Sequence, residues 1–230
     1  MRPVDKGPGH GPYAIYGDAL PDLRNAIGDF CSYCERQIET HLAVEHVQPK
    51  SRKKALLTDW SNFLLGCVHC NSSKGKKRVK LINLLWPDRD NTQRAFDYDQ
   101  SGIVTVSVNL PAANSAQANA TIKLVGLDKI PGHAEKKRQA TQSDIRWLRR
   151  QQAFHLSQRH HANLQQQDTP IVRELIVDVA HGRGMFSIWM QAFAGDADMR
   201  GRLIQKFHGT AANCFDPQTR ALVPRPGGQI

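Results

Sequence analysis

The hydrophobic pattern of the chain predicts short strands in its middle and helices in its second half. Residues 103–108 alternate between apolar and polar side chains with the period of a strand, and residues 95–100 precede them across a turn at Ser101-Gly102. Helices are expected at residues 18–26, 114–127, 134–166, 170–180, 185–194 and 199–207. The pattern therefore predicts an α+β protein with a mainly helical C-terminal half.

Turn residues and composition divide the chain into four expected parts. Residues 1–29 form an N-terminal arm, loose as far as Tyr16, and a short helix that stops at Gly28. Residues 30–80 hold four of the five cysteines and most of the charge. Residues 81–127 form a small β element followed by a helix, and residues 128–230 form a helical region. The last residues, 224–230, are expected to fray.

The charge of the chain favours a polyanionic or acidic partner. The 230 residues carry a formal net charge of +10, with a pI near 9.6. Residues 47–80 contain nine Lys or Arg and only one acidic residue, Asp59. A basic surface that is merely solvated remains the alternative. A second basic stretch, residues 136–159, interleaves Trp147 and Phe154 with cations and is a further candidate for nucleic-acid or partner binding.

The start of the chain does not look like a secretory leader, and no apolar run is long enough to span a bilayer. We therefore expect a cytoplasmic protein that has no membrane partner. In a reducing cytoplasm, paired cysteines bind metal more often than they form disulfides.

Two C-x-x-C knuckles predict a structural zinc site. Cys31 and Cys34 form the first, and Cys67 and Cys70 form the second. Two intervening residues let a tight turn aim both thiolates at one tetrahedral Zn²⁺. Buried free thiols or a redox pair are the alternatives, although a redox motif would need only one knuckle.

Three further motifs lie between and after the knuckles. They are Glu45-His46-Val47-Gln48-Pro49, then Asn62 before the apolar run Phe63-Leu64-Leu65, then Cys70-Asn71-Ser72-Ser73-Lys74-Gly75. These motifs resemble those of the HNH endonuclease family, which has a ββα-metal fold. They cover about 50 of the 230 residues in the family's order. The resemblance implies a zinc-stapled ββα-metal module over residues 30–80.

The resemblance also implies a role for each motif residue. His46 would be the general base, and Glu45 and Asn71 would hold a catalytic divalent cation, Mg²⁺ or another ion. Asn62 would fix the loop that carries the histidine. One difficulty is geometric, because adjacent strand residues point to opposite faces, and Glu45 and His46 are adjacent.

Glu45 stands where the family more often has Asp, as in a bacterial anti-phage subset that this chain resembles. In Septu-type and some retron-associated systems, such proteins work beside an ATPase, so we expect an ATPase subunit as a partner in antiviral defence. The chain has no G-x-x-x-x-G-K-[ST] loop of its own.

The resemblance implies one-metal hydrolysis of DNA. Basic residues of the module are expected to contact the phosphate backbone: Lys50, Lys74, Lys76, Lys77 and Arg78. Two alternatives remain open. One is an RNase that cleaves tRNA, and the other is a zinc-knuckle module that binds nucleic acid or a partner without chemistry.

Overall fold

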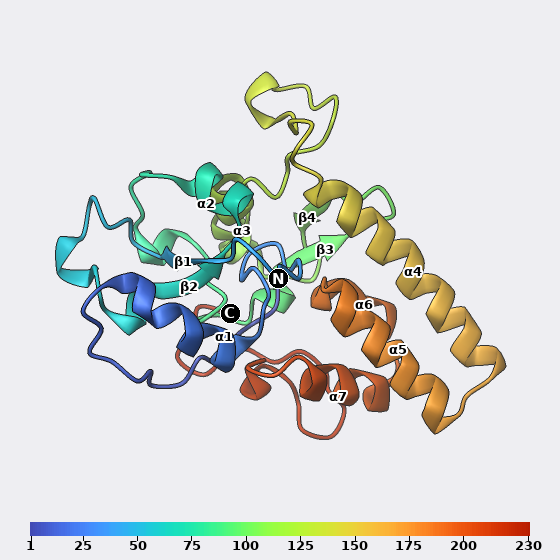
Figure 1. The fold of residues 1–230 in the computed structure, drawn as a ribbon. Helices are drawn as coiled ribbons and strands as arrows, with labels where there is room; N and C mark the ends of the chain where they lie inside the picture. The colour runs from blue at the N-terminus through green and yellow to red at the C-terminus, as the bar shows by residue number, and fades with distance from the viewer.

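The computed structural model describes all residues, 1–230, and shows an α+β protein (Figure 1). Strands β1 (Ala43–His46) and β2 (Phe63–Gly66) pair antiparallel, with Glu45 opposite Leu64 and His46 opposite Phe63. Helix α2 (Val68–Lys74) follows β2 directly. These elements form the expected ββα unit.

A second small sheet and a helix lie beside this unit. Strands β3 (Phe96–Tyr98) and β4 (Val104–Val106) pair antiparallel, as the alternating pattern predicts. Helix α3 (Ala112–Val125) packs against both α2 and β4. It ends at Gly126, whose φ of +65° places it in the left-handed region that favours glycine at a helix end.

Four helices make up the C-terminal half: α4 (Arg146–Gln166), α5 (Pro170–Arg183), α6 (Phe186–Ala192) and α7 (Ala197–Lys206). Helices α4 and α5 run side by side on the right of Figure 1, with α6 against α4 and α7 against α5. Thr169 caps α5 by accepting a hydrogen bond from the Val172 amide, and Pro170 is well suited to the first turn because it needs no donor there.

Helix α1 (Leu20–Ile27) precedes the ββα unit, and its Leu23 and Ile27 side chains are buried. Seven 3₁₀ turns complete the chain: Tyr16–Ala19, Lys54–Leu56, Trp60–Asn62, Leu81–Asn83, Thr92–Arg94, Lys136–Arg138 and Ala212–Cys214. No helix combines the length and the apolar character that a bilayer span requires.

The buried side chains form two apolar clusters. The larger cluster surrounds the ββα unit and takes residues from all four expected parts of the chain, including Val4, Leu64, Val125 and Ile188. The smaller one fills the space among α5, α6 and α7, and Phe30 joins it from the cysteine-rich segment. The ββα unit is therefore packed into the rest of the protein on several sides.

The structure corrects three expectations about flexible or helical segments. The N-terminal arm is not loose at its start, because Met1 and Val4 are buried and the Val4 backbone bridges to Thr210. Ile230 is only 3% exposed, so the last residues pack instead of fraying. Residues 134–145 are not part of the long helix, which begins at Arg146. Between residues 134 and 144 no apolar side chain is larger than Ala, so a helix there would have no face to bury.

Candidate functional site

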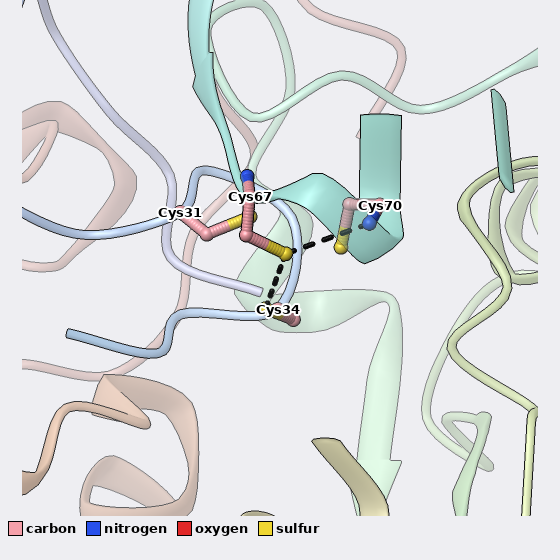
Figure 2. Close-up of side chains that lie close together, drawn as sticks. All are labelled: Cys31, Cys34, Cys67 and Cys70. Atoms are coloured by element: carbon pink, nitrogen blue, oxygen red, sulfur yellow. Dashed lines mark hydrogen bonds between the residues drawn. The ribbon is translucent and has the colours of Figure 1, made fainter. Parts of the chain in front are cut away.

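The two cysteine knuckles meet in one buried cluster. Cys31 and Cys34 lie in the loop before β1, Cys67 caps the N-terminus of α2, and Cys70 lies in its first turn (Figure 2). All four Sγ atoms are within 4.8 Å of one another, and those of Cys34 and Cys67 are 3.7 Å apart. Four sulfurs at 2.3 Å from a tetrahedral zinc would be separated by about 3.8 Å. The donor set and its spacing fit Zn²⁺.

Backbone contacts hold the knuckles in place. The Cys31 sulfur accepts a hydrogen bond from the Cys67 amide at 3.3 Å, and the Ser32 amide donates to the Leu65 carbonyl at 2.8 Å. Burial raises the pKa of the Cys31 and Cys70 thiols well above the ordinary value. A cation among the four sulfurs would reverse that effect, because it stabilises the thiolate form.

A buried arginine from α4 contacts the same cluster, and sequence patterns mark this residue only as one cation in a basic stretch. Arg146 donates to the Cys70 sulfur at 3.1 Å and to the carbonyl oxygens of Val125 and Gly126 at 2.9 and 2.8 Å. It also binds both carboxylate oxygens of Asp144, each at 2.7 Å. All five guanidinium N–H groups are therefore used.

The charges of this cluster reinforce one another. Burial opposes ionisation of both Arg146 and Asp144. The Cys70 sulfur and Asp144 nevertheless raise the pKa of Arg146, and Arg146 holds the pKa of Asp144 below its usual value. The first turn of α4 is thus tied to the cysteine cluster by a charged group.

His46 lies at the end of β1 between two aromatic rings. Its ring is edge-on to Tyr16 and to Phe63, with centroid separations of 5.0 and 5.2 Å. The His46 Nε2 atom lies 2.9 Å from the Leu57 carbonyl oxygen. A carbonyl can only accept, so Nε2 carries the proton and Nδ1 of the neutral ring keeps its lone pair.

The surroundings of His46 favour the neutral ring. Burial is the main cause that lowers its pKa, and the nearby charges of Lys50 and Lys74 lower it further. The hydrogen bond to Leu57 opposes this shift. A histidine that is neutral at pH 7 can accept a proton from water.

Glu45 points to the other face of the β1–β2 ribbon and contacts Lys74. The Lys74 Nζ atom lies 2.6 Å from Glu45 Oε1, in an ion pair whose direction is poor for a hydrogen bond. The same ammonium donates to the His46 carbonyl oxygen at 2.5 Å. Burial raises the pKa of Glu45, and Lys74 counteracts the shift. Lys74 therefore binds the side chain of one predicted site residue and the backbone of the next.

Asn71 and Glu45 meet at Gly66, the last residue of β2. A Cβ atom at Gly66 would lie 2.9 Å from the Glu45 Cβ and 3.8 Å from the Asn71 Cβ. The missing side chain lets both residues pack close to the Gly66 backbone. Their carboxylate and amide oxygens are ligand types that suit Mg²⁺ and similar cations.

Asn62 ties the loop after β1 to the start of β2. Its Oδ1 accepts from the Gln48 amide at 2.7 Å, and its Nδ2 donates to the carbonyl oxygens of Gln48 and Leu56 at 3.0 and 3.2 Å. Asn62 is 2% exposed, so all these bonds are shielded from water. Leu57, the carbonyl partner of His46, follows Leu56 directly.

The basic residues expected to contact phosphate separate into two groups. Lys50, Lys76, Lys77 and Arg78 are exposed, and Lys50 lies over the Tyr16 ring next to His46. Lys74 does not belong with them, because it is 2% exposed and its ammonium faces Glu45. The helical position of Lys74, which turns it inward from its neighbours, accounts for the difference.

A comparison with protein-family models agrees with this geometry. Residues 31–77 match the model described as HNH endonuclease, a span that includes both knuckles, β1, β2 and α2. A search of curated proteins found no match to the chain. The family typically consists of metal-dependent nucleases that act on nucleic acid. Residues 31–77 of this protein therefore form an HNH endonuclease domain.

Proposed function

We propose that the protein is an endonuclease that hydrolyses DNA, with His46 as the general base and one divalent cation held by Glu45 and Asn71. The observation that carries this proposal is the state of His46 within the matched domain. Its Nε2 is occupied by the Leu57 carbonyl, no protein group bonds its Nδ1, and its pKa is lowered. Such a ring can activate a water molecule at neutral pH.

The reaction needs one proton transfer and one displacement at phosphorus. His46 Nδ1 takes a proton from water as the water oxygen forms a bond to phosphorus. The bond from phosphorus to the 3′ oxygen breaks, and that oxygen leaves with a proton from solvent, which gives 5′-phosphate and 3′-hydroxyl ends. A divalent cation, when bound, would neutralise charge on the phosphate and on the leaving oxygen. General-base catalysis of this kind contributes about 10²–10⁴-fold in rate.

The other residues of the site position these groups. Asn62 fixes the loop that ends at Leu57, and so holds the His46 ring in one orientation. Lys74 bonds the backbone carbonyl of His46 and pairs with the Glu45 carboxylate, so one ammonium holds both the end of β1 and the Glu45 side chain. Zinc at the four cysteines would fix α2, which carries Asn71. A reducing cytoplasm would keep those thiols free to bind it.

Incubation of the protein with supercoiled plasmid and with total tRNA, each with and without Mg²⁺, tests the proposal. We expect Mg²⁺-dependent nicking of the plasmid and a loss of about 10²–10⁴-fold in the His46→Ala variant. The His41→Ala variant is the matched control, since His41 is exposed and its ring contacts only Thr40 among hydrogen-bonding groups.

Other outcomes of this experiment would assign a different function. Cleavage of tRNA alone would make the protein an RNase. If the parent protein and the His46→Ala variant both bind a substrate equally and neither cleaves it, the protein is a non-catalytic zinc-knuckle module.

We also propose that an ATPase subunit accompanies this nuclease in anti-phage defence. This proposal depends on the motif resemblance, in which Glu45 replaces the commoner Asp. Expression of the chain with and without a candidate ATPase subunit, followed by phage challenge, would test it. Protection by the chain alone at the full level would contradict it.

A further inference from the structure

A groove lies along the exposed side of α4. It has a volume of about 640 Å³ and is lined by side chains of α4 and by the last residue of α5. The lining residues on α4 that matter here are Arg149, Gln152, His155 and Arg159, and Arg183 completes the groove from α5. Their spacing of three, six and ten residues along α4 places these four side chains toward one side of the helix.

The charge of this groove is positive and unopposed. Three of its eight lining residues are arginines, a fourth is a histidine, and none is a carboxylate. Arg149, Arg159 and Arg183 take part in none of the ion pairs of the protein. The one polar contact within the set is a hydrogen bond from Arg149 to the Gln152 side chain at 2.9 Å. Unpaired arginines without acids nearby favour an anionic ligand, and the planar guanidinium matches phosphate geometry.

A second basic cavity, beside α2 and α3, differs in this respect. It contains Lys77, Lys123 and Lys129, but also Asp128 and Glu135. Arg138 in that cavity forms ion pairs with both acids, and Lys137 pairs with Glu135. Its charge is therefore partly neutralised within the protein, whereas the charge of the α4 groove is not.

The α4 groove is held at a fixed position relative to the HNH domain. Arg146, in the first turn of α4, bonds the Cys70 sulfur of the cysteine cluster, and Arg149 lies one turn further along the same helix. The ten residues from Arg149 to Arg159 span about 15 Å at 1.5 Å per residue. Phosphates of one strand of a duplex recur at about 3.4 Å along its axis, so this length matches about four nucleotides.

We propose that this groove binds the sugar–phosphate backbone of the nucleic acid that the HNH domain cuts. The proposal extends the proposed function and rests on it. Arg149, Arg159 and Arg183 contact phosphates at a distance from the cut and supply affinity that carries no sequence information. The substrate interface therefore continues from the HNH domain onto the C-terminal half of the protein.

Salt-dependent binding of a labelled 30-base-pair DNA duplex tests the groove. All proteins carry His46→Ala and receive no added Mg²⁺, so that binding is measured without cleavage and without chelating the cysteine cluster. The test protein adds Arg149→Gln, Arg159→Gln and Arg183→Gln, which remove three charges and keep good helix formers. Each phosphate contact contributes about 0.9 to the slope of log affinity against log salt, so we expect the slope to fall by about 2.7.

A matched control removes the same charge elsewhere. It combines Arg89→Gln, Arg202→Gln and Lys206→Gln, whose side chains are 41, 38 and 43% exposed and lie outside the groove. We expect its slope to change by less than half as much as that of the groove protein. Circular dichroism melting of both proteins confirms that they remain folded.

The outcomes separate this inference from the nuclease assignment. An unchanged slope in the triple Arg→Gln variant, or an equal fall in the control, overturns the groove proposal. The ligand of the groove would then be an acidic protein surface and not nucleic acid. If the slope falls while the chain with intact His46 cuts nothing, the groove stands and the nuclease proposal fails. If that chain cuts and the slope is unchanged, the reverse holds.

Discussion

Lys74 shows how one residue links the two sides of the β1–β2 ribbon. Its ammonium is buried between the Glu45 carboxylate and the His46 carbonyl, and its side chain is 2% exposed. A buried ion pair costs desolvation, and removing one partner leaves the other charge without compensation. The pair therefore matters to stability mainly because loss of either partner would leave the other charge buried and unpaired.

The variant Lys74→Met should lower the free energy of unfolding by about 3–5 kcal/mol at pH 7, since Glu45 would remain buried and unpaired. Urea denaturation measures this. The exposed neighbour provides the control, and Lys77→Met should cost under about 0.5 kcal/mol. The double variant Lys74→Met with Glu45→Gln should recover part of the loss, because the uncompensated charge is gone. Equal losses in the single and double variants would contradict the pairing.

Contacts within the cysteine motifs could be predicted from the sequence, whereas contacts between residues far apart in the chain could not. The four cysteines were expected to converge, and their sulfurs do. The sequence groups Lys74 with the basic residues Lys76, Lys77 and Arg78, but only those three are exposed, and Lys74 is buried. Arg146 was one cation among several in a basic stretch, and only the tertiary structure places it against Cys70.

At the scale of elements, the close approach at the end of β2 depends on Gly66. Gly66 pairs with Ala43, and Ala43 lies two residues before Glu45 on β1. Residues two apart on a strand point to the same face, so Glu45 and Gly66 share a face of the ribbon. A Cβ atom at Gly66 would lie only 2.9 Å from the Glu45 Cβ, so the Glu45 side chain would have to shift. The glycine thus lets the Glu45 side chain of β1 pack against the end of β2, next to Asn71 of α2.

The variant Gly66→Ala should destabilise the protein by about 1–3 kcal/mol, the typical cost of overpacking a filled site. It should also raise the Mg²⁺ concentration needed for half-maximal cleavage, because Glu45 must shift. Thermal melting and a Mg²⁺ titration of plasmid nicking measure the two effects. Gly182→Ala is the control, since nothing lies within 4 Å of a Cβ there and α5 should gain stability. If Gly66→Ala is as stable as the parent protein, the contact between residue 66 and Glu45 is not tight.

Element boundaries followed from the sequence where apolar faces or caps define them. The helix expected from residue 170 does begin at Pro170, and the alternating residues 103–108 contain β4. The start of α4 could not be predicted, because residues 134–144 carry helix-compatible side chains but no apolar face. Its first turn is fixed by contacts of Arg146, whose partners Gly126, Val125 and Cys70 lie 20, 21 and 76 residues away along the chain.

At the scale of the whole molecule, the cysteine cluster joins the HNH domain to the C-terminal half. Arg146 connects α4 to Cys70 and to the end of α3, and both Arg146 and Asp144 are nearly fully buried. A zinc ion bound by the four thiolates would have a net charge of −2, and the Arg146 guanidinium would offset part of it. The metal site should therefore stabilise more than the segment that supplies its ligands.

The variant Arg146→Met should cost about 3–5 kcal/mol in the free energy of unfolding, because Asp144 is left as a buried, unpaired charge. It should also speed the loss of zinc to a chelator. Urea denaturation and a colorimetric zinc-release assay measure these effects. The exposed neighbour serves as control, and Arg149→Met should leave both nearly unchanged. Parent-like zinc release in Arg146→Met would show that the guanidinium does not support the cluster.

The measurement that tests the central claim most directly is the pH dependence of kcat/KM for plasmid nicking at saturating Mg²⁺. Activity requires the neutral His46 ring, so the rate should fall as pH drops through the pKa of His46. Burial places that pKa below the ordinary value of 6.5, and the acid limb should therefore have its midpoint below pH 6.5. The residual activity of His46→Ala should lack this limb. An acid limb that persists unchanged in His46→Ala would contradict the assignment of His46 as the base.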